Sequence, residues 1–390
     1  MSDVRNHRID DDLDRLVSEL HQIAPIRSAP ITSDTPELAE WLRQVRDQDG
    51  SDLLLVAGLP PLARIKGQVS RLRGEPLSGD DIEAAVSPIV PTRLKERYRD
   101  GEAVDLAFTL KGLGRFRMNL HRERGRQAAA IRALPTRVPR LSELHFSHDV
   151  SLLAELPRGL VLVCGPTGSG KTTTLAALIA EINTKHSRHI VTVEDPIEYE
   201  HGHGRSVIEQ VEIGMDSPDF PTALRAAMRQ APDVIVVGEM RDPETMRIAL
   251  AAAETGHLVL ATVHATDAAA AVSRIADAFP VERQNAVRQE MAMALAAVLT
   301  QSLLQTKTRS LVPVAELLLV SYGARQHIRK NALQHLNQEI TITRKAGSFT
   351  LEESLAKLVL GGVLDRADAM LRAAHPEELE SLLRGVMGSG

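Results

Sequence analysis

The sequence predicts an α/β chain in two parts, an N-terminal α+β domain followed by a larger domain built on a mainly parallel sheet. Short apolar runs cluster together between residues 35 and 134, which favours an antiparallel sheet. From residue 151 onward, apolar runs alternate with helical segments. Between these patterns, residues 135–150 contain two prolines and mixed polarity, which is typical of a linker. We therefore expect one domain over 35–134 and a second over 151–390.

Composition narrows the classes of protein to which the chain can belong. No apolar stretch approaches the ~18 residues needed to cross a bilayer, and the polar start MSDVRNHRIDDD lacks the apolar core of a signal peptide, so we expect a cytoplasmic protein. The single cysteine, Cys164, excludes an internal disulfide and a multi-cysteine zinc site. The net charge of -5 gives no overall attraction to nucleic acid or to membranes.

The first domain is expected to follow a charged N-terminal extension over residues 1–34. Apolar periodicity predicts a helix over 36–45 and further helices between about residues 80 and 100. Strands are predicted over 51–56, 62–67, 103–110, 114–121 and 127–134. Because these strands follow one another without long helices between most of them, an antiparallel sheet is favoured.

The second domain opens with the strand GLVLVCG (159–165) and the helix TTTLAALIAEIN (172–183). Further strands are predicted over 189–195, 233–238 and 257–264, and further helices over 221–230 and 243–256. This alternation is typical of right-handed crossovers in a mainly parallel sheet with helices on both faces. From about residue 267 we expect mostly helices.

Residues 165–172 read GPTGSGKT, a complete phosphate-binding loop between a strand and a helix. The glycines let backbone amides turn toward phosphate oxygens at the positive end of the following helix. Lys171 is expected to bridge the β- and γ-phosphates of ATP, and Thr172 to hold Mg²⁺. The predicted nucleotide-binding residues are Gly165, Thr167, Gly168, Ser169, Gly170, Lys171, Thr172 and Thr173.

Carboxylates follow two further strands of the predicted sheet. Glu194, Asp195 and Glu198 gather in EDPIEYE, at the edge where open parallel sheets bind ligands. Such a cluster positions water or metal, although a solvated acidic loop would read the same way. Glu239 follows four apolar residues in DVIVVGEMRD, where an acid of the Walker B type belongs, one strand over from the loop. Glu239 is thereby a second predicted ligand of Mg²⁺.

Two histidines bracket the last predicted strand, His257 and His264. Because their separation of seven residues is odd, alternation along a strand directs their side chains to opposite faces. His264 lies at the ligand-binding end and is expected to sense the γ-phosphate by hydrogen bonding. His257 lies at the other end, where a packing or subunit contact is favoured.

A basic stretch runs from Lys111 to Arg140. Clustered arginines could form a nucleic-acid face, but Phe116 is the only aromatic residue among them, which supports stacking poorly. One or two could instead reach the γ-phosphate of a neighbouring subunit, and Arg117 and Arg132 are the candidates. Most of these side chains must in any case form a solvated face.

Taken together, these motifs resemble the type IV pilus retraction ATPases, within the secretion ATPase superfamily. The shared stretches run from about residue 50 to 305 and include GLPPLARIKG, GRFRMNL, RGLVLVCGPTGSGKTTTLAALIAEIN, VTVEDPIEYEH, PDVIVVGEMRDPETMRIALAAAETGHLVLATVHAT, RIADAFP and LTQSLL. The resemblance implies a PAS-like domain followed by a RecA-like ATPase domain with a helical C-terminal part. It also implies a homo-hexameric ring with ATP at the subunit boundaries.

The resemblance further implies roles for the acids and for partners. Glu198 would activate the attacking water, and Glu239 would help to position Mg²⁺ and water, with Glu194 and Asp195 ranked below them. The motor would act on an inner-membrane pilus platform protein, and so associate peripherally with the cytoplasmic face of that membrane, and a paralogous retraction ATPase could share the work. No nucleic acid is expected as a partner.

Two features refine the assignment and three depart from it. One cysteine cannot build the tetracysteine zinc insertion of extension and type II secretion ATPases, and GARQHIRKN (323–331) resembles the retraction motif AIRNLIRE. The family's SDLH, QRE and DPD stretches here carry Leu54, Val211 and Ala231 in place of a histidine, an arginine and an aspartate. A weakly hydrolysing regulatory ring subunit and a nucleic-acid-dependent translocase therefore stay open as alternatives to a retraction motor.

Overall fold

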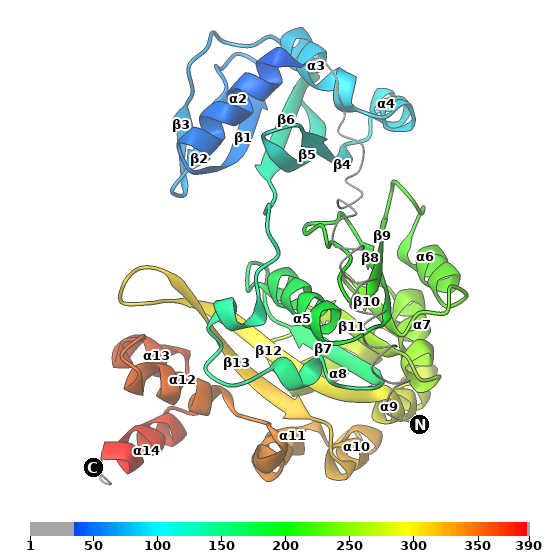
Figure 1. Cartoon of the computed structure of the whole chain (residues 1–390), viewed down its shortest axis with the longest axis vertical. Helices are drawn as coiled ribbons and strands as arrows, with labels where there is room; N and C mark the ends of the chain where they lie inside the picture. The colour runs from blue at the N-terminus through cyan, green and yellow to red at the C-terminus, as the bar shows by residue number, and fades with distance from the viewer. Residues whose placement is uncertain (1–34, 388–390) are drawn as a thin grey trace, which may run out of the picture. The chain divides into compact units, whose positions relative to one another are not determined.

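The computed structural model describes residues 35–387, and its contacts divide the chain into two compact units. One unit comprises residues 35–137 together with 196–202, and the other comprises 138–195 and 203–387 (Figure 1). The predicted N-terminal extension over 1–34 lies outside the described residues. No helix within 35–387 is long and apolar enough to cross a membrane.

The N-terminal unit is built on a six-stranded antiparallel sheet in the order β3-β2-β1-β6-β5-β4, which confirms the antiparallel prediction. Its strands are β1 Gly50–Val56, β2 Leu62–Ile65, β3 Gln68–Arg71, β4 Val104–Leu110, β5 Gly114–Glu123 and β6 Arg126–Ala133. Its helices are α2 Pro36–Asp47, α3 Gly79–Val86 and α4 Thr92–Arg99. The sequence analysis missed β3, whose four residues are all exposed and so lack an apolar pattern.

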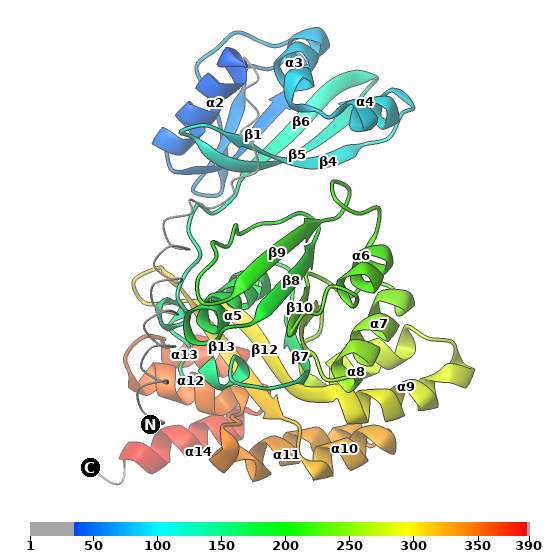
Figure 2. The ribbon, with the colours of Figure 1, turned by 45° about the vertical axis from the view of Figure 1, so that its right-hand side comes forward.

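One face of this antiparallel sheet is buried beneath the helices. Along β4 the buried residues Val104, Leu106, Phe108 and Leu110 alternate with more exposed ones, as expected when one face of an antiparallel strand meets the core. The buried side chains join those of α2, α3 and α4 in a single apolar cluster. Figure 2 shows these helices lying over one face of the sheet. The unit thus has a hydrophobic core of its own.

The second unit is built on a seven-stranded sheet in the order β13-β12-β7-β11-β10-β8-β9. Its strands are β7 Gly159–Cys164, β8 His189–Glu194, β9 Val207–Glu212, β10 Val234–Val237, β11 Leu258–Val263, β12 Leu295–Gln305 and β13 Leu311–Leu319. All neighbouring pairs are parallel except β12 with β13, which confirms the mainly parallel sheet. The strand β9 was not predicted.

The strand order corrects one expectation. We expected the strand before Glu239 to lie one strand over from the loop, but β11 pairs with both β7 and β10 and separates them. The connection through α5 (Lys171–Lys185) leads from β7 to β8, skipping two positions that β10 and β11 fill later in the chain. Alternating sequence elements define such crossovers, but they do not define how many positions each one skips.

Helices cover both faces of the parallel sheet (Figure 1). On one face, α5 packs with the short 3₁₀ turns at Leu141–Leu144 and Ser151–Leu153 against alternate strand residues. The opposite face carries α6 Phe220–Ala227, α7 Pro243–Glu254, α8 Ala268–Asp277, α9 Val281–Ala294, α10 Tyr322–Arg329 and α11 Leu336–Ile342. Every residue of β7 and β11 is buried because helices lie on both sides of them.

The expectation of a mostly helical chain after residue 267 is wrong for β12 and β13, which extend the sheet. The helix α9 ends at Ala294 and β12 begins at Leu295, with no glycine or proline between them. The alanine-rich segment has no local break, so pairing with β7 and β13 overrides its helical propensity. The chain then ends in α12 Leu351–Leu360, α13 Arg366–Arg372 and α14 Pro376–Met387, which pack beside β13.

Candidate nucleotide-binding site

The loop between β7 and α5 has the backbone conformation that its glycines predict. Gly165, Gly168 and Gly170 have φ values of 150°, 78° and 83°, in the region that favours glycine. A Cβ atom at Gly165 would overlap the carbonyl oxygen of Gln301 on β12. Gly170 forms the N-cap of α5, so the loop leads directly into the positive end of that helix. This geometry forms a cradle for an anion.

Lys171, the first residue of α5, lies folded back over this loop. Its Nζ donates hydrogen bonds to the carbonyl oxygens of Gly165 and Pro166, both at 2.9 Å. Burial lowers the pKa of Lys171, and the nearby carboxylate of Glu239 partly opposes that shift. Lys171 is 9% exposed, so its ammonium group lies at the cradle and not in solvent.

Gln301 holds the loop from the side of β12, and the sequence analysis did not select it. Its Nε2 donates to the backbone oxygen of Ser169 at 2.7 Å, and its side chain is buried. The stretch LTQSLL was noticed only as part of the family resemblance. No spacing rule connects a glutamine more than 130 residues away with the loop, since the pairing of β12 with β7 brings them together.

Glu239 lies just beyond β10, between two side chains that donate to it. Its Oε2 accepts from Arg241 Nη2 at 2.7 Å, and its Oε1 lies 3.1 Å from His264 Nε2. Burial alone would raise the pKa of Glu239, but the hydrogen bond and charge of Arg241, helped by His264 and Lys171, lower it. Glu239 is therefore a carboxylate at neutral pH.

The structure brings His264, which follows β11, together with Glu239, whereas its contact with the γ-phosphate stays a prediction. Burial lowers the pKa of His264, and the positive charge of Lys171 adds to this effect. The imidazole is therefore neutral at pH 7, with Nε2 donating to Glu239. A neutral ring with a fixed donor is suited to sensing a nearby phosphate oxygen or carboxylate.

His257 has the packing role that its position favoured. Its Nδ1 lies 2.9 Å from the carbonyl oxygen of Ala252 and 3.3 Å from the hydroxyl of Thr255, at the end of α7. The backbone oxygen of His257 also accepts from the amide of Gly159 at 2.9 Å, at the start of β7. These contacts join His257 to the end of α7 and to the start of β7, at the end of the sheet opposite the phosphate loop.

Glu194 lies at the end of β8. Its Oε1 accepts from the hydroxyl of Thr192 at 2.7 Å and from Nε2 of Gln210 at 3.1 Å. The charge of the following residue, Asp195, contributes to the raised pKa of Arg241, after the hydrogen bond from Arg241 to Glu239. Arg241 thus interacts electrostatically with acids that follow both β8 and β10.

The remaining predicted catalytic residues belong to the N-terminal unit. Glu198 lies in the segment 196–202, which groups with that unit, and Arg117 and Arg132 lie on β5 and β6. Arg117 Nη2 is 3.5 Å from Asp105 Oδ1, and Arg132 Nε is 2.8 Å from Asp52 Oδ1. Their roles at the nucleotide stay predictions.

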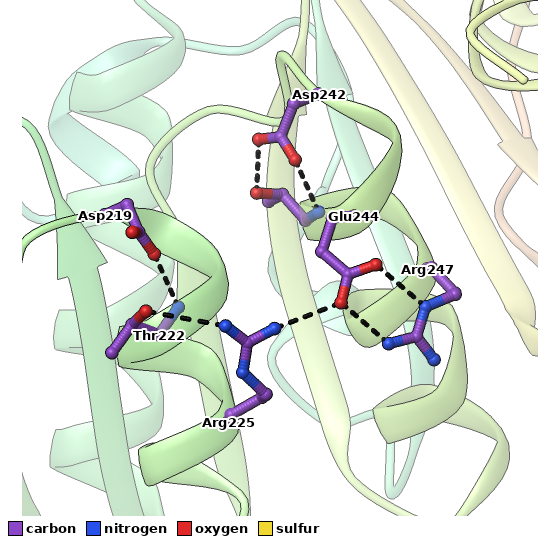
Figure 3. A network of polar contacts seen from close by, with 7 residues as sticks. Asp219, Thr222, Arg225, Asp242, Glu244 and Arg247 are labelled. Carbon is purple, nitrogen blue, oxygen red and sulfur yellow. Dashed lines mark hydrogen bonds and ion pairs between the residues drawn. The ribbon is translucent and has the colours of Figure 1, made fainter.

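A polar network anchors the two helices that flank the Glu239 loop (Figure 3). Asp242, three residues after Glu239, caps α7 by accepting from the backbone amide of Thr245 at 2.8 Å. Arg225 on α6 pairs with Glu244 at 3.0 Å, and Glu244 also pairs with Arg247 at 2.8 Å. The network joins the start of α7 to α6.

Comparison with known proteins gives consistent matches. Residues 115–360 match the family described as Type II/IV secretion system protein. The chain is 37% identical to the type IV pilus retraction ATPase PilT of Pseudomonas aeruginosa, over 87% of this chain and 99% of that protein. It is 39% identical to a twitching motility protein of Neisseria gonorrhoeae, over 83% of this chain and 87% of that protein.

Solved structures agree with the sequence matches. The crystal structure of the pilus retraction motor PilT with bound ADP is similar with a TM-score of 0.80 and 39% identity, covering 88% of this chain and 99% of that one. The Legionella pneumophila ATPase DotB shares the fold, with a TM-score of 0.75 at 23% identity over 87% of this chain and 95% of its own.

Proposed function

Since the chain belongs to the type II/IV secretion system protein family and is an ATPase of the pilus retraction type, we propose that it is a hexameric MgATP-driven motor for type IV pilus retraction. In this proposal a PAS-like N-terminal domain and a RecA-like domain complete the nucleotide site at subunit boundaries. The ring works at the cytoplasmic face of the inner membrane, acts on a platform protein of the pilus machine and supports twitching motility.

The cradle at the phosphate loop is the observation that carries this proposal. The phosphate loop brings together three glycines with positive φ, the start of α5 and the Nζ of Lys171. Backbone amides and an ammonium group suit the phosphates of ATP, and the crowding at Gly165 leaves no space for a side chain there. The hydroxyl of Thr172 and the carboxylate of Glu239 suit Mg²⁺, which would neutralise phosphate charge when bound.

The chain's own residues have distinct tasks in the proposed reaction. Lys171 exchanges the carbonyl oxygens of Gly165 and Pro166 for phosphate oxygens when ATP binds. His264 holds the Glu239 carboxylate in place through Nε2. Glu198 accepts the proton of the attacking water, and Arg117 or Arg132 stabilises the developing charge on a neighbouring subunit's phosphate.

A regulatory ring subunit with weak hydrolysis is the second candidate function. Ala231 adopts φ 53°, a left-handed conformation that the family's aspartate tolerates better than alanine. Val211 on β9 packs against the apolar cluster, where the family's arginine would bring a charge.

The first experiment is to measure MgATP turnover per subunit over a wide range of protein concentrations. Turnover that rises as subunits assemble supports a motor with sites shared between subunits. Assembly and ATP binding with almost no turnover would instead support the regulatory subunit, and Val211→Arg would then be the first substitution to test. Added DNA or RNA should leave turnover unchanged; salt-sensitive stimulation would support a translocase.

Glu198→Gln tests the proposed general base. The substitution removes the basic carboxylate and keeps the shape of the side chain, so we expect intact assembly and ATP binding with turnover lowered by roughly 10²–10⁴-fold. The measurement is single-turnover hydrolysis beside nucleotide titration. Glu75→Gln, which removes an exposed carboxylate elsewhere in the chain, is the control for loss of charge. Wild-type turnover in Glu198→Gln would disprove the assignment.

A further inference from the structure

Gln301 on β12 contacts the phosphate loop at two points, and we propose that it is a positioning residue that aims a backbone amide of the loop at the phosphates of ATP. Its Nε2 donates to the carbonyl oxygen of Ser169 at 2.7 Å. Its own carbonyl oxygen lies against Gly165, where a Cβ atom would overlap it. Gln301 is 2% exposed, so water does not compete for the hydrogen bond to Ser169.

The strand β12 supplies a fixed support for these contacts. It lies between β7 and β13 and pairs with both of them. Thr300 is in register with Cys164, the last residue of β7. Gln301 is therefore level with Gly165, the first residue of the loop, and its side chain reaches Ser169 near the loop's other end. The position of the loop depends on a strand that lies more than 130 residues further along the chain.

The hydrogen bond to Ser169 also sets the direction of the next amide. In a trans peptide unit the carbonyl and the N–H group point in opposite directions. Because the carbonyl of Ser169 points at Gln301, the N–H of Gly170 in the same peptide unit points away from Gln301. A cradle for an anion requires backbone N–H groups that are turned away from the surrounding protein and toward the ligand. Gln301 thus selects the orientation in which the Gly170 amide is available to phosphate.

Gly170 is a position at which this peptide unit could otherwise rotate. Its φ of 83° lies in the region open to glycine, and among residues 35–387 no acceptor takes its amide. Its carbonyl accepts from the amide of Thr174 at 2.9 Å, but that bond fixes the following peptide unit and not this one. Rotation would present the Ser169 carbonyl oxygen to the phosphates in place of a donor. The Nε2 of Gln301 opposes this rotation.

Packing alone does not account for a glutamine at this position. Its neighbours on the same face of β12, Leu299 and Leu303, are apolar. The Oε1 of Gln301 is buried and has no hydrogen-bond partner among the described residues, which costs stability. An apolar side chain would avoid this cost. A locally unfavourable residue is expected where its remaining contact serves function, and here that contact is the bond to Ser169.

Titration of the full-length protein with ATP, ADP and inorganic pyrophosphate, each with Mg²⁺, tests the proposal. Gln301→Met keeps the length of the side chain and removes the donor. A peptide unit that samples both orientations binds phosphate in only one of them, so we expect the affinity for all three ligands to fall about fivefold to thirtyfold. Pyrophosphate carries no adenosine, so a loss of its binding locates the effect at the phosphate loop.

Two further substitutions and one control separate the hydrogen bond from packing. Gln301→His retains an N–H donor of similar reach, and its affinity should stay within about threefold of the wild-type value. Gln301→Glu places an acceptor against the Ser169 carbonyl and should weaken binding more than Gln301→Met does. Gln305→Met makes the same change at the exposed end of the same strand and should leave affinity intact.

Wild-type affinity in Gln301→Met, or an equal loss in Gln301→His or Gln305→Met, would overturn the proposal. If Gln301→Met does not fold, the comparison of Gln301→His with Gln301→Glu gives the same decision. Chemical denaturation is measured in parallel, since lower stability with unchanged affinity would assign Gln301 to packing alone. The inference rests on ATP binding at this loop as proposed above. Absence of binding by the wild-type protein would contradict that function, whereas equal binding by wild type and Gln301→Met contradicts only the role of Gln301.

Discussion

The two sheets of this protein differ in where their functional side chains lie. In the parallel sheet, β7, β10 and β11 are buried throughout and contain no charged residue, so charged side chains lie only beyond their ends. Those ends meet at one edge, which is how Glu239, His264 and Lys171 come to influence one another. In the antiparallel sheet, buried and more exposed residues alternate along β4 and β5. Its arginines are therefore distributed along the strands, where Arg117 pairs with Asp105 and Arg132 with Asp52.

This difference explains why motif analysis succeeds in one unit and leaves open questions in the other. A polar residue after a buried parallel strand has few places to lie, whereas an arginine on an exposed strand face has many neighbours. Arg132, for example, pairs with Asp52, whose pKa is lowered by hydrogen bonds from Ser51 and Arg132 despite partial burial. The following substitutions test whether nucleotide affinity depends only on residues of the unit that contains the parallel sheet, and what these residues contribute to stability.

Lys171→Ala should have the largest effect. It removes the ammonium group at the cradle, and with two charge-assisted contacts to phosphate lost we expect nucleotide affinity to fall roughly 100-fold or more. Titration with a fluorescent ATP analogue measures the change. Lys185→Ala removes a lysine from the far end of the same helix and should leave the affinity intact. Unchanged binding in Lys171→Ala would contradict the assignment of the cradle.

Gly165→Ala should come next. The new Cβ would overlap the Gln301 carbonyl oxygen, and the residue would keep a φ of 150°. We expect a loss of about 2–3 kcal/mol in the free energy of unfolding, with weaker nucleotide binding, since both strain and overlap act here. Chemical denaturation measures the first effect. Gly168→Ala meets no atom within 4 Å, so its cost should be smaller.

Glu316→Gln should have a moderate effect with a definite sign. Because the folded-state pKa is raised to about 7, ionising this acid costs free energy as pH rises from its unfolded pKa near 4.5 through 7. The glutamine should therefore stabilise the fold by on the order of 1–3 kcal/mol at pH 8 and by little at pH 5. Denaturation at both pH values checks this. A gain that is equal at both would mean that ionisation is not the cause.

Arg132→Ala should have the smallest effect on the properties compared here. Its side chain is 68% exposed, so loss of its pair with Asp52 should cost less than about 1 kcal/mol of stability. Nucleotide affinity should stay at the wild-type value. If Arg132 acts on a neighbouring subunit, turnover should fall and be partly restored in rings mixed with wild-type subunits. Arg126→Ala, on the same strand, is the control for loss of charge.

Local patterns predicted most of the fold. Strand–helix alternation identified the parallel sheet, and clustered strands identified the antiparallel one. The strand β12 was missed because the alanine-rich chain around Leu295 carries no local break, and β13, its antiparallel neighbour, was missed with it. The phosphate loop could be predicted because its glycines and Lys171 are contiguous. Gln301 could not, since its contact with Ser169 exists only after β12 has paired with β7.

The chain passes between the two units not only at the linker but also at the segment 196–202. It departs from the end of β8, groups with the N-terminal unit through contacts such as the 2.7 Å pair of Glu200 with Arg115, and returns at His203. Ile197 and Tyr199 within it are buried. Truncation after residue 137 would remove the unit with which this segment groups, including Arg115, the partner of Glu200. A stand-alone ATPase fragment made by cutting only at the linker would therefore carry a loop that lacks the unit it groups with, which favours misfolding and aggregation. Such a fragment would be a poor substitute for the whole chain in biochemical work.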